Sequence, residues 1–161
     1  MQIKTSFEEL CKITNDVLLE NEDEEIKFTL MPLTNGVIVD FHKLPLGIIN
    51  YSGEVYFRLL HFEDEILHIT FKFKNFFLEM LKKALIRAVI GIAKKQMIKN
   101  GVDIAKYIHY HDSEIQLEIN RIMKESGSPL VLVGMESHSG IFSLNLQYLG
   151  LSKKTQKLLT N

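Results

Sequence analysis

Histidines are the residues of this chain whose type and spacing come closest to a metal or catalytic site. His109 and His111 are separated by one residue, and Asp112 follows directly. In a strand, the two imidazoles would point to the same face and could share a zinc ion. Three other histidines could supply a further ligand from distant parts of the chain: His61, His68 and His138.

Motifs that would support catalysis are missing from the sequence. It contains no His-Glu-x-x-His, no paired cysteines, no Gly-x-Ser-x-Gly elbow and no glycine-rich phosphate loop. Cys11 lies on the apolar stripe of a predicted helix, which favours a buried, unreactive thiol. We therefore interpret the His109–His111 pair as surface residues, and we expect a non-enzymatic protein without metal or cofactor.

Composition limits the class of protein and its partners. The chain has 161 residues, of which 46% are hydrophobic and 24% charged, as in an ordinary single globular domain. A formal net charge of −1 argues against bulk nucleic-acid binding. However, residues 8–25 are mainly acidic, whereas residues 72–99 are basic except for Glu79. These two segments could neutralise each other, or the basic one could face an anionic partner.

Targeting signals are also missing. The first residues lack the apolar run of a signal peptide, and the longest apolar block, residues 84–93, is short and interrupted by Arg87. The single cysteine excludes an intramolecular disulfide and fits a reducing compartment. We therefore expect a cytoplasmic protein.

The periodicity of the chain predicts an α+β domain over residues 1–161. Ser6 and Glu9 form a capping box that should begin a short helix, which ends before the acidic run at 20–25. Alternating residues then predict strands at 26–33 and 37–41, joined by a Thr34-Asn35-Gly36 turn. A loop or strand corner is expected at 44–47.

The second half should begin with another hairpin, of strands around 51–59 and 67–73 with an acidic turn at 63–65. A long helix over 75–99 follows, ending at Asn100-Gly101. Residues 104–111 are compatible with either helix or strand. The remaining segments are predicted to be a strand at 115–119, one or two helical turns before Gly127, strands at 129–136 and 140–148, and a polar tail from about 150. Together they predict a curved antiparallel sheet of about six strands, packed on one long central helix.

The predicted long helix has two different sides. Six residues form its apolar side: Phe77, Leu81, Leu85, Ala88, Val89 and Ile92. Three basic residues form the opposite side, which would face an anion or a membrane: Lys83, Arg87 and Lys94. Burying each large apolar member contributes roughly 1.5–3 kcal/mol, so this side must be covered. It could pack on the sheet as plain core, or leave room for an apolar ligand bound by Phe71, Phe73, Phe77, Leu81 and Leu85.

Several segments resemble small bacterial members of the tubular lipid-binding superfamily, the bactericidal/permeability-increasing-like proteins. The resemblance spans roughly residues 26–148 and rests on strand patterning and turns. Its segments are FTLMPLTNGVIVD (28–40), YSGEVYFRL (51–59), FEDE (62–65), IQLEINRIM (115–123), PLVLV (129–133) and GIFSL (140–144). It implies a strongly curved antiparallel sheet that wraps a long helix around an apolar groove, and it implies lipid binding without catalytic residues.

Taken together, these features predict a protein that binds an apolar or lipid-like molecule, with peripheral membrane contact through the basic side of the helix. The alternative is a structural homodimer in which a second copy covers the apolar surface.

Overall fold

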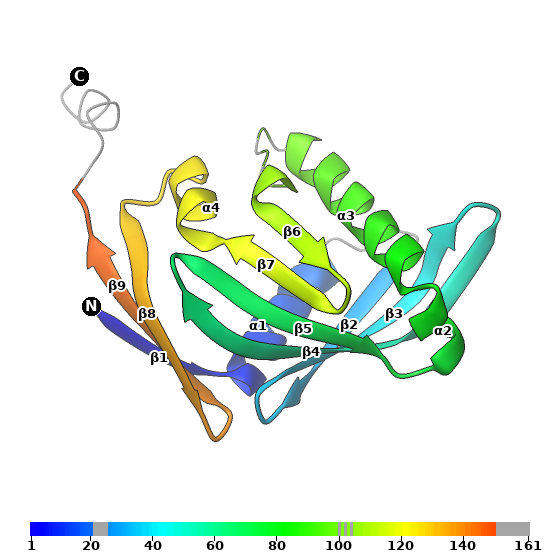
Figure 1. The fold of residues 1–161 in the computed structure, drawn as a ribbon, viewed down its shortest axis with the longest axis horizontal. Coiled ribbons are helices and arrows are strands. Elements are labelled where there is room, and N and C mark those ends of the chain that lie inside the picture. The colour runs from blue at the N-terminus through cyan, green and yellow to red at the C-terminus, as the bar shows by residue number, and fades with distance from the viewer. Residues whose placement is uncertain (21–25, 100, 102, 104, 151–161) are drawn as a thin grey trace.

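Within the described residues, the chain forms nine strands in two antiparallel sheets, with helices that connect and cover them (Figure 1). The computed structural model describes residues 1–20, 26–99, 101, 103 and 105–150. A six-stranded sheet has the order β2-β3-β4-β5-β7-β6, and a three-stranded sheet has the order β1-β9-β8. The α+β class with antiparallel sheets is confirmed.

The elements follow one another in two halves. The first half contains β1 (Gln2–Ser6), α1 (Phe7–Glu20), β2 (Lys27–Leu33), β3 (Gly36–Leu46), β4 (Ile49–Glu63) and β5 (Ile66–Phe73). The second half contains α2 (Phe76–Met80), α3 (Lys82–Lys99), η1 (Ala105–Tyr107), β6 (Ile108–His111), β7 (Glu114–Glu118), α4 (Ile119–Glu125), β8 (Leu130–His138) and β9 (Ile141–Tyr148).

Local signals located several elements correctly. The capping box is present, since the amide of Glu9 donates to Ser6 Oγ at 3.1 Å and the amide of Ser6 donates to Glu9 Oε2 at 3.2 Å. The alternation of β4 and β5 is also confirmed, because Phe57 pairs with Phe71 and so shares a face of the sheet with it. These elements depend on residues close together in the chain, which is why their pattern is visible in the sequence.

Gly36 has a different role from the one expected. The β2–β3 turn falls at Thr34 and Asn35, as predicted, but neither Asn35 nor Gly36 has a positive φ. Gly36 is the first residue of β3, and a Cβ there would lie 1.9 Å from the carbonyl oxygen of Phe57. The glycine is therefore needed for the close approach of β3 to β4.

The prediction of one long helix over residues 75–99 is wrong, because two shorter helices, α2 and α3, occupy this segment. They meet at Leu81, which caps α2 with φ −91° and ψ 4°. Leu78 anchors α2 on the sheet beside Gly53, and Leu85 anchors α3 further along. The break lets the helix axis change direction between the two anchors, as Figure 1 shows.

The expected wrapping of one curved sheet around a central helix is also wrong. β8 and β9 leave the main sheet and pair with β1, a strand that the sequence did not reveal. The six-stranded sheet has no strong curl, and α3 lies across one end of it. The three-stranded sheet, α1 and α4 lie over the other end of its apolar face.

Three other predictions concern segment boundaries. The ambiguous residues 104–111 contain η1 followed by β6, in the part that the structure describes. In place of the loop or corner expected at 44–47, β3 continues to Leu46 after a register shift between Phe41 and Leu44, and the chain turns at Gly47. Residues 21–25 of the acidic run and residues 151–161 of the polar tail lie outside the described residues.

Candidate functional site: apolar cavities on the inner face of the sheet

The inner face of the six-stranded sheet is apolar along its whole length. Successive side chains of a strand point to opposite faces, so the paired residues Val39, Val55 and Phe73 share this inner face. Leu59, Ile69 and similar residues continue it toward the β4–β5 turn. Two different covers meet this face: α2 and α3 at one end, and α1, α4 and the three-stranded sheet at the other (Figure 1).

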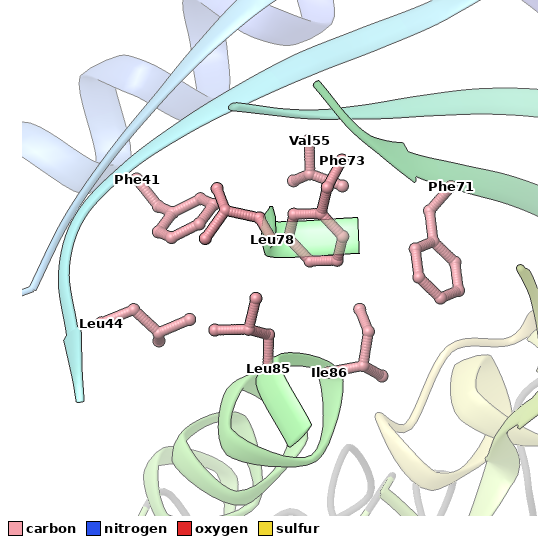
Figure 2. Packing of buried hydrophobic residues seen from close by; sticks show 8 residues of the cluster. All are labelled: Phe41, Leu44, Val55, Phe71, Phe73, Leu78, Leu85 and Ile86. Atoms are coloured by element: carbon pink, nitrogen blue, oxygen red, sulfur yellow. The ribbon is translucent and has the colours of Figure 1, made fainter. Parts of the chain in front are cut away.

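Under α2 and α3 the cover forms a hydrophobic core, and a smaller cavity lies beside it. Two pairs of rings meet edge to face: Phe41 with Phe73 at 6.2 Å between centroids, and Phe71 with Phe73 at 6.3 Å. Leu85 has no exposed surface. Figure 2 shows how the eight buried side chains converge from the sheet and the helices: Phe41, Leu44, Val55, Phe71, Phe73, Leu78, Leu85 and Ile86.

The structure places the five predicted ligand-binding residues in different surroundings. Phe71, Phe73 and Leu85 lie together in this core, and Leu81 packs against it while partly exposed. Phe77 instead lies on the outside of α2, 57% exposed, with its ring 6.3 Å from that of Tyr51. Three of the five residues are therefore brought together, and Phe77 is separated from them.

A cavity of about 400 Å³ lies at the other end of the inner face, between the two sheets. The six-stranded sheet, the three-stranded sheet, α1 and α4 all contribute to its wall, and every residue of the wall is apolar. The wall consists of Phe7, Leu10, Gly36, Val37, Phe57, Leu59, Leu67, Ile69, Ile119, Met123, Leu132, Met135, Phe142, Leu144 and Leu146. Leu10 is 39% exposed, so it marks the rim of the cavity.

A second apolar cavity, of about 270 Å³, lies between α1, α3 and the same face of the sheet. Phe57 borders both cavities, so its ring stands between them. Phe73, one of the predicted ligand-binding residues, also belongs to the second wall. The complete wall is Leu18, Phe28, Leu30, Val39, Phe41, Leu44, Val55, Phe57, Phe73, Ile86 and Val89.

A buried polar side chain next to the wall residue Ile119 is already used within the protein. Asn120 on α4 is buried, and its Nδ2 donates to the carbonyl of Leu132 at 2.9 Å. Its Oδ1 accepts from the amide of Leu132 at 2.7 Å. In the described residues, every buried side-chain nitrogen or oxygen has a hydrogen-bond partner. The cavity thus presents no spare polar group to a ligand.

Sequence reasoning missed most of the residues around the larger cavity. Apolar alternation could identify Leu144 and Leu146 as inward-facing residues of a strand. However, it could not show that they face Leu59 and Leu67 across a gap, because that arrangement depends on how the two sheets meet.

Five of the six histidines lie beside separate carboxylates, and His138 is not among them. His109 lies on β6 with its Nε2 2.7 Å from Glu118 Oε1, and the more exposed His111 pairs with its neighbour Asp112. Among the described residues, no group of three or more His, Cys, Asp or Glu side chains could hold a metal ion.

His68 lies on another strand and makes the shortest of these contacts. Its Nδ1 is 2.6 Å from Glu114 Oε1, and this hydrogen bond, together with one from Gln116, lowers the pKa of the Glu114 carboxyl. The ring of His61 stacks on that of His68 at 4.3 Å. The arrangement joins β4, β5 and β7 on the outer face of the sheet, away from the apolar cavities.

Cys11 is buried on α1, as predicted, and 2% exposed. Burial raises the pKa of its thiol, which disfavours the reactive thiolate.

The three basic residues expected to face an anion or membrane are exposed along α3. These are Lys83, Arg87 and Lys94. Arg87 also reaches toward β6, where its Nε donates to Tyr110 Oη at 3.0 Å.

Comparisons with protein-family models, with curated proteins and with solved structures found no match. The resemblance to tubular lipid-binding proteins therefore stays a prediction from the sequence. Among the described residues, none of the helices combines the length and apolar character needed to span a bilayer.

Proposed function

We propose that the protein binds an apolar molecule, such as the acyl chain of a lipid, in the cavity between its two sheets. The observation that carries this proposal is a cavity of about 400 Å³ with an entirely apolar wall. An open, concave and apolar site of this kind is typical of ligand pockets. The volume also falls within the range of small-molecule pockets, roughly 300–1,000 Å³.

Water is a poor occupant of this cavity. At about 30 Å³ each, about a dozen water molecules would match its volume, but the wall offers them no hydrogen-bond partner. A hydrocarbon chain, in contrast, gains about 0.8 kcal/mol for each buried methylene. A segment of about eight methylenes would contribute roughly 6 kcal/mol before the costs of association.

The wall supports binding rather than catalysis. It supplies no side chain that could transfer a proton or act as a nucleophile. Met123 and Met135 are flexible side chains that adapt to ligands of different shape. The second cavity, beyond Phe57, would give a longer chain further apolar surface to cover. This class of ligand agrees with the lipid binding that the family resemblance implies.

The test compares palmitic acid binding by two tryptophan variants of the same strand, β9. Leu144→Trp puts a large ring into the cavity, whereas Ile141→Trp puts the same ring on the exposed outer face. We expect Leu144→Trp to weaken binding at least about ten-fold, a loss of roughly 1.4 kcal/mol, and Ile141→Trp to bind like the parent. Thermal unfolding of both variants checks that they are folded.

Native mass spectrometry of protein purified without detergent provides a second measurement. We expect the mass of one chain plus a retained apolar molecule. Equal affinity of the two variants for palmitic acid, or no binding by the parent, would contradict the proposal. A dimer without bound lipid would favour the structural homodimer instead.

A further inference from the structure

The short helix α2 presents large apolar side chains to solvent. Phe76 is 79% exposed and Met80 is 69% exposed, and Phe77 is also more than half exposed. α2 lies at one end of the molecule, beside the strands of the β3–β4 hairpin (Figure 1). Exposed apolar residues usually occur singly on a soluble protein, so three in a helix of five residues require an explanation.

The neighbouring hairpin enlarges this apolar surface. Ile48 is fully exposed at the β3–β4 turn, and Ile49 is more than half exposed. Tyr51 shares the face of β4 on which Ile49 lies, and its ring is 6.3 Å from that of Phe77. We call the set Ile48, Ile49, Phe76, Phe77 and Met80 the α2 patch.

Local contacts hold α2 in the orientation that exposes the patch. Asn75 caps the helix by accepting from the amide of Phe77 at 2.8 Å. Leu78 is the buried residue of the helix and packs against Gly53 of the sheet. Phe76 and Met80, each two residues from Leu78, lie on the opposite side of the helix and face outward.

The one acidic residue of α2 is directed back to the protein. Glu79 accepts from the amide of Phe73 at 2.9 Å through Oε2, and from Lys82 Nζ at 3.1 Å through Oε1. Its charge is thus balanced by Lys82, and it presents little negative charge beside the patch.

A cationic stripe begins directly beyond the patch. Lys83 is three residues after Met80, and Arg87 follows one helical turn later, with Lys94 further along the same helix. All three are exposed, and none takes part in an ion pair between described residues. The sequence of α3 from Lys82 to Lys99 contains no acidic residue.

We propose that the α2 patch and this stripe dock the protein on an anionic lipid bilayer. Aromatic and aliphatic side chains enter the boundary between headgroups and acyl chains, while lysine and arginine attract anionic headgroups. A symmetric second copy fits less well, because the same surface repeated on a second chain offers the cationic stripe no acidic partner from α3. The proposal does not depend on what occupies the cavity between the sheets.

The experiment uses tryptophan as a reporter, because the chain has none of its own. Phe76→Trp places the reporter in the patch, and Tyr148→Trp places one on an exposed residue of the three-stranded sheet. Each is mixed with vesicles of phosphatidylcholine alone or with phosphatidylglycerol added. We expect a blue shift and quenching by brominated lipid for Phe76→Trp with anionic vesicles, and no change for Tyr148→Trp.

Charge and apolar contact are then tested separately by co-sedimentation with the same vesicles. Lys83→Glu and Phe77→Ser should each reduce binding to anionic vesicles at least about ten-fold. Added salt should weaken the binding of the parent protein. Both residues are exposed, so the variants should unfold at the temperature of the parent. Equal binding to neutral vesicles, or none to either kind, overturns the proposal. So does a dimer in sedimentation that Phe77→Ser converts to monomer.

Discussion

Asn120 and Asn15 make the same pair of hydrogen bonds in different surroundings, which allows the effect of burial to be measured. Asn120 bonds both the amide and the carbonyl of Leu132, at 2.7 and 2.9 Å. Asn15 does the same for Leu30, at 2.8 Å in both bonds. Each asparagine therefore acts as the missing neighbour of an edge strand, β8 or β2.

The expected effect of Asn120→Ala follows from burial. Asn120 and Leu132 are 8% and 4% exposed, so water replaces the lost partners poorly. An unsatisfied buried donor or acceptor costs about 1–3 kcal/mol. Losing both partners should thus lower the free energy of unfolding by about 2–6 kcal/mol. In Asn15→Ala the backbone groups are only part-buried, and the loss should be about 1–2 kcal/mol.

Urea unfolding of the two variants, extrapolated linearly to water, measures this difference. The slope of the transition should stay unchanged, since neither variant alters the surface exposed on unfolding. Equal losses for Asn120→Ala and Asn15→Ala would refute the reasoning, as would a loss below about 1 kcal/mol at Asn120.

An aspartate at Asn120 gives a second test of the same interactions. A protonated carboxyl can still accept from the amide of Leu132 and donate to its carbonyl, but a carboxylate cannot donate. Burial should therefore raise the pKa of the new group above its ordinary value of about 3.9. Asn120→Asp should be most stable at low pH and should lose stability as the pH rises through that raised pKa.

Two further predictions concern backbone space and pH. Gly36→Ala should lower the free energy of unfolding by more than about 2 kcal/mol, because its Cβ meets the Phe57 carbonyl. Gly91→Ala, in α3 with open space around it, should instead raise it by about 0.5–1 kcal/mol, and urea unfolding measures both variants. The pKa of Glu114 lies below its ordinary value of 4.5 because of the hydrogen bond to His68. The ionised carboxylate therefore stabilises the folded protein above pH 4.5, and this stabilisation is lost as the pH falls through the lowered pKa. Glu114→Gln should therefore reduce the change in the free energy of unfolding over this acidic pH range. Urea unfolding at several pH values measures it, and an unchanged pH dependence would contradict the prediction.

Local patterns in the sequence were sufficient for several elements. The Ser6–Glu9 capping box, the alternation of β4 and β5 and the acidic turn between them all depend on neighbouring residues. The basic side of the helix after residue 75 could also be assigned from spacing, whereas Phe77 was wrongly placed on its apolar side. In each case the structural signal spans only a few residues, so no distant contact is needed to read it.

Other features depended on contacts between distant segments. β1 is a short, mostly exposed strand, and only its pairing with β9 at the other end of the chain makes it a strand. The break at Leu81 follows from two separate anchors on the sheet. Gly36 looked like a turn glycine, but its contact with Phe57 arises from the approach of β3 to β4.

The same distinction applies to the candidate site. Alternation in the sequence determined that Phe71 and Leu59 lie on the apolar face of one sheet, and that this face must be covered. Only the tertiary structure decided that Phe71 lies in a filled core while Leu59 lines a cavity. The physical reason is that period-two alternation specifies the direction of a side chain, whereas the space in front of it depends on how closely other elements approach.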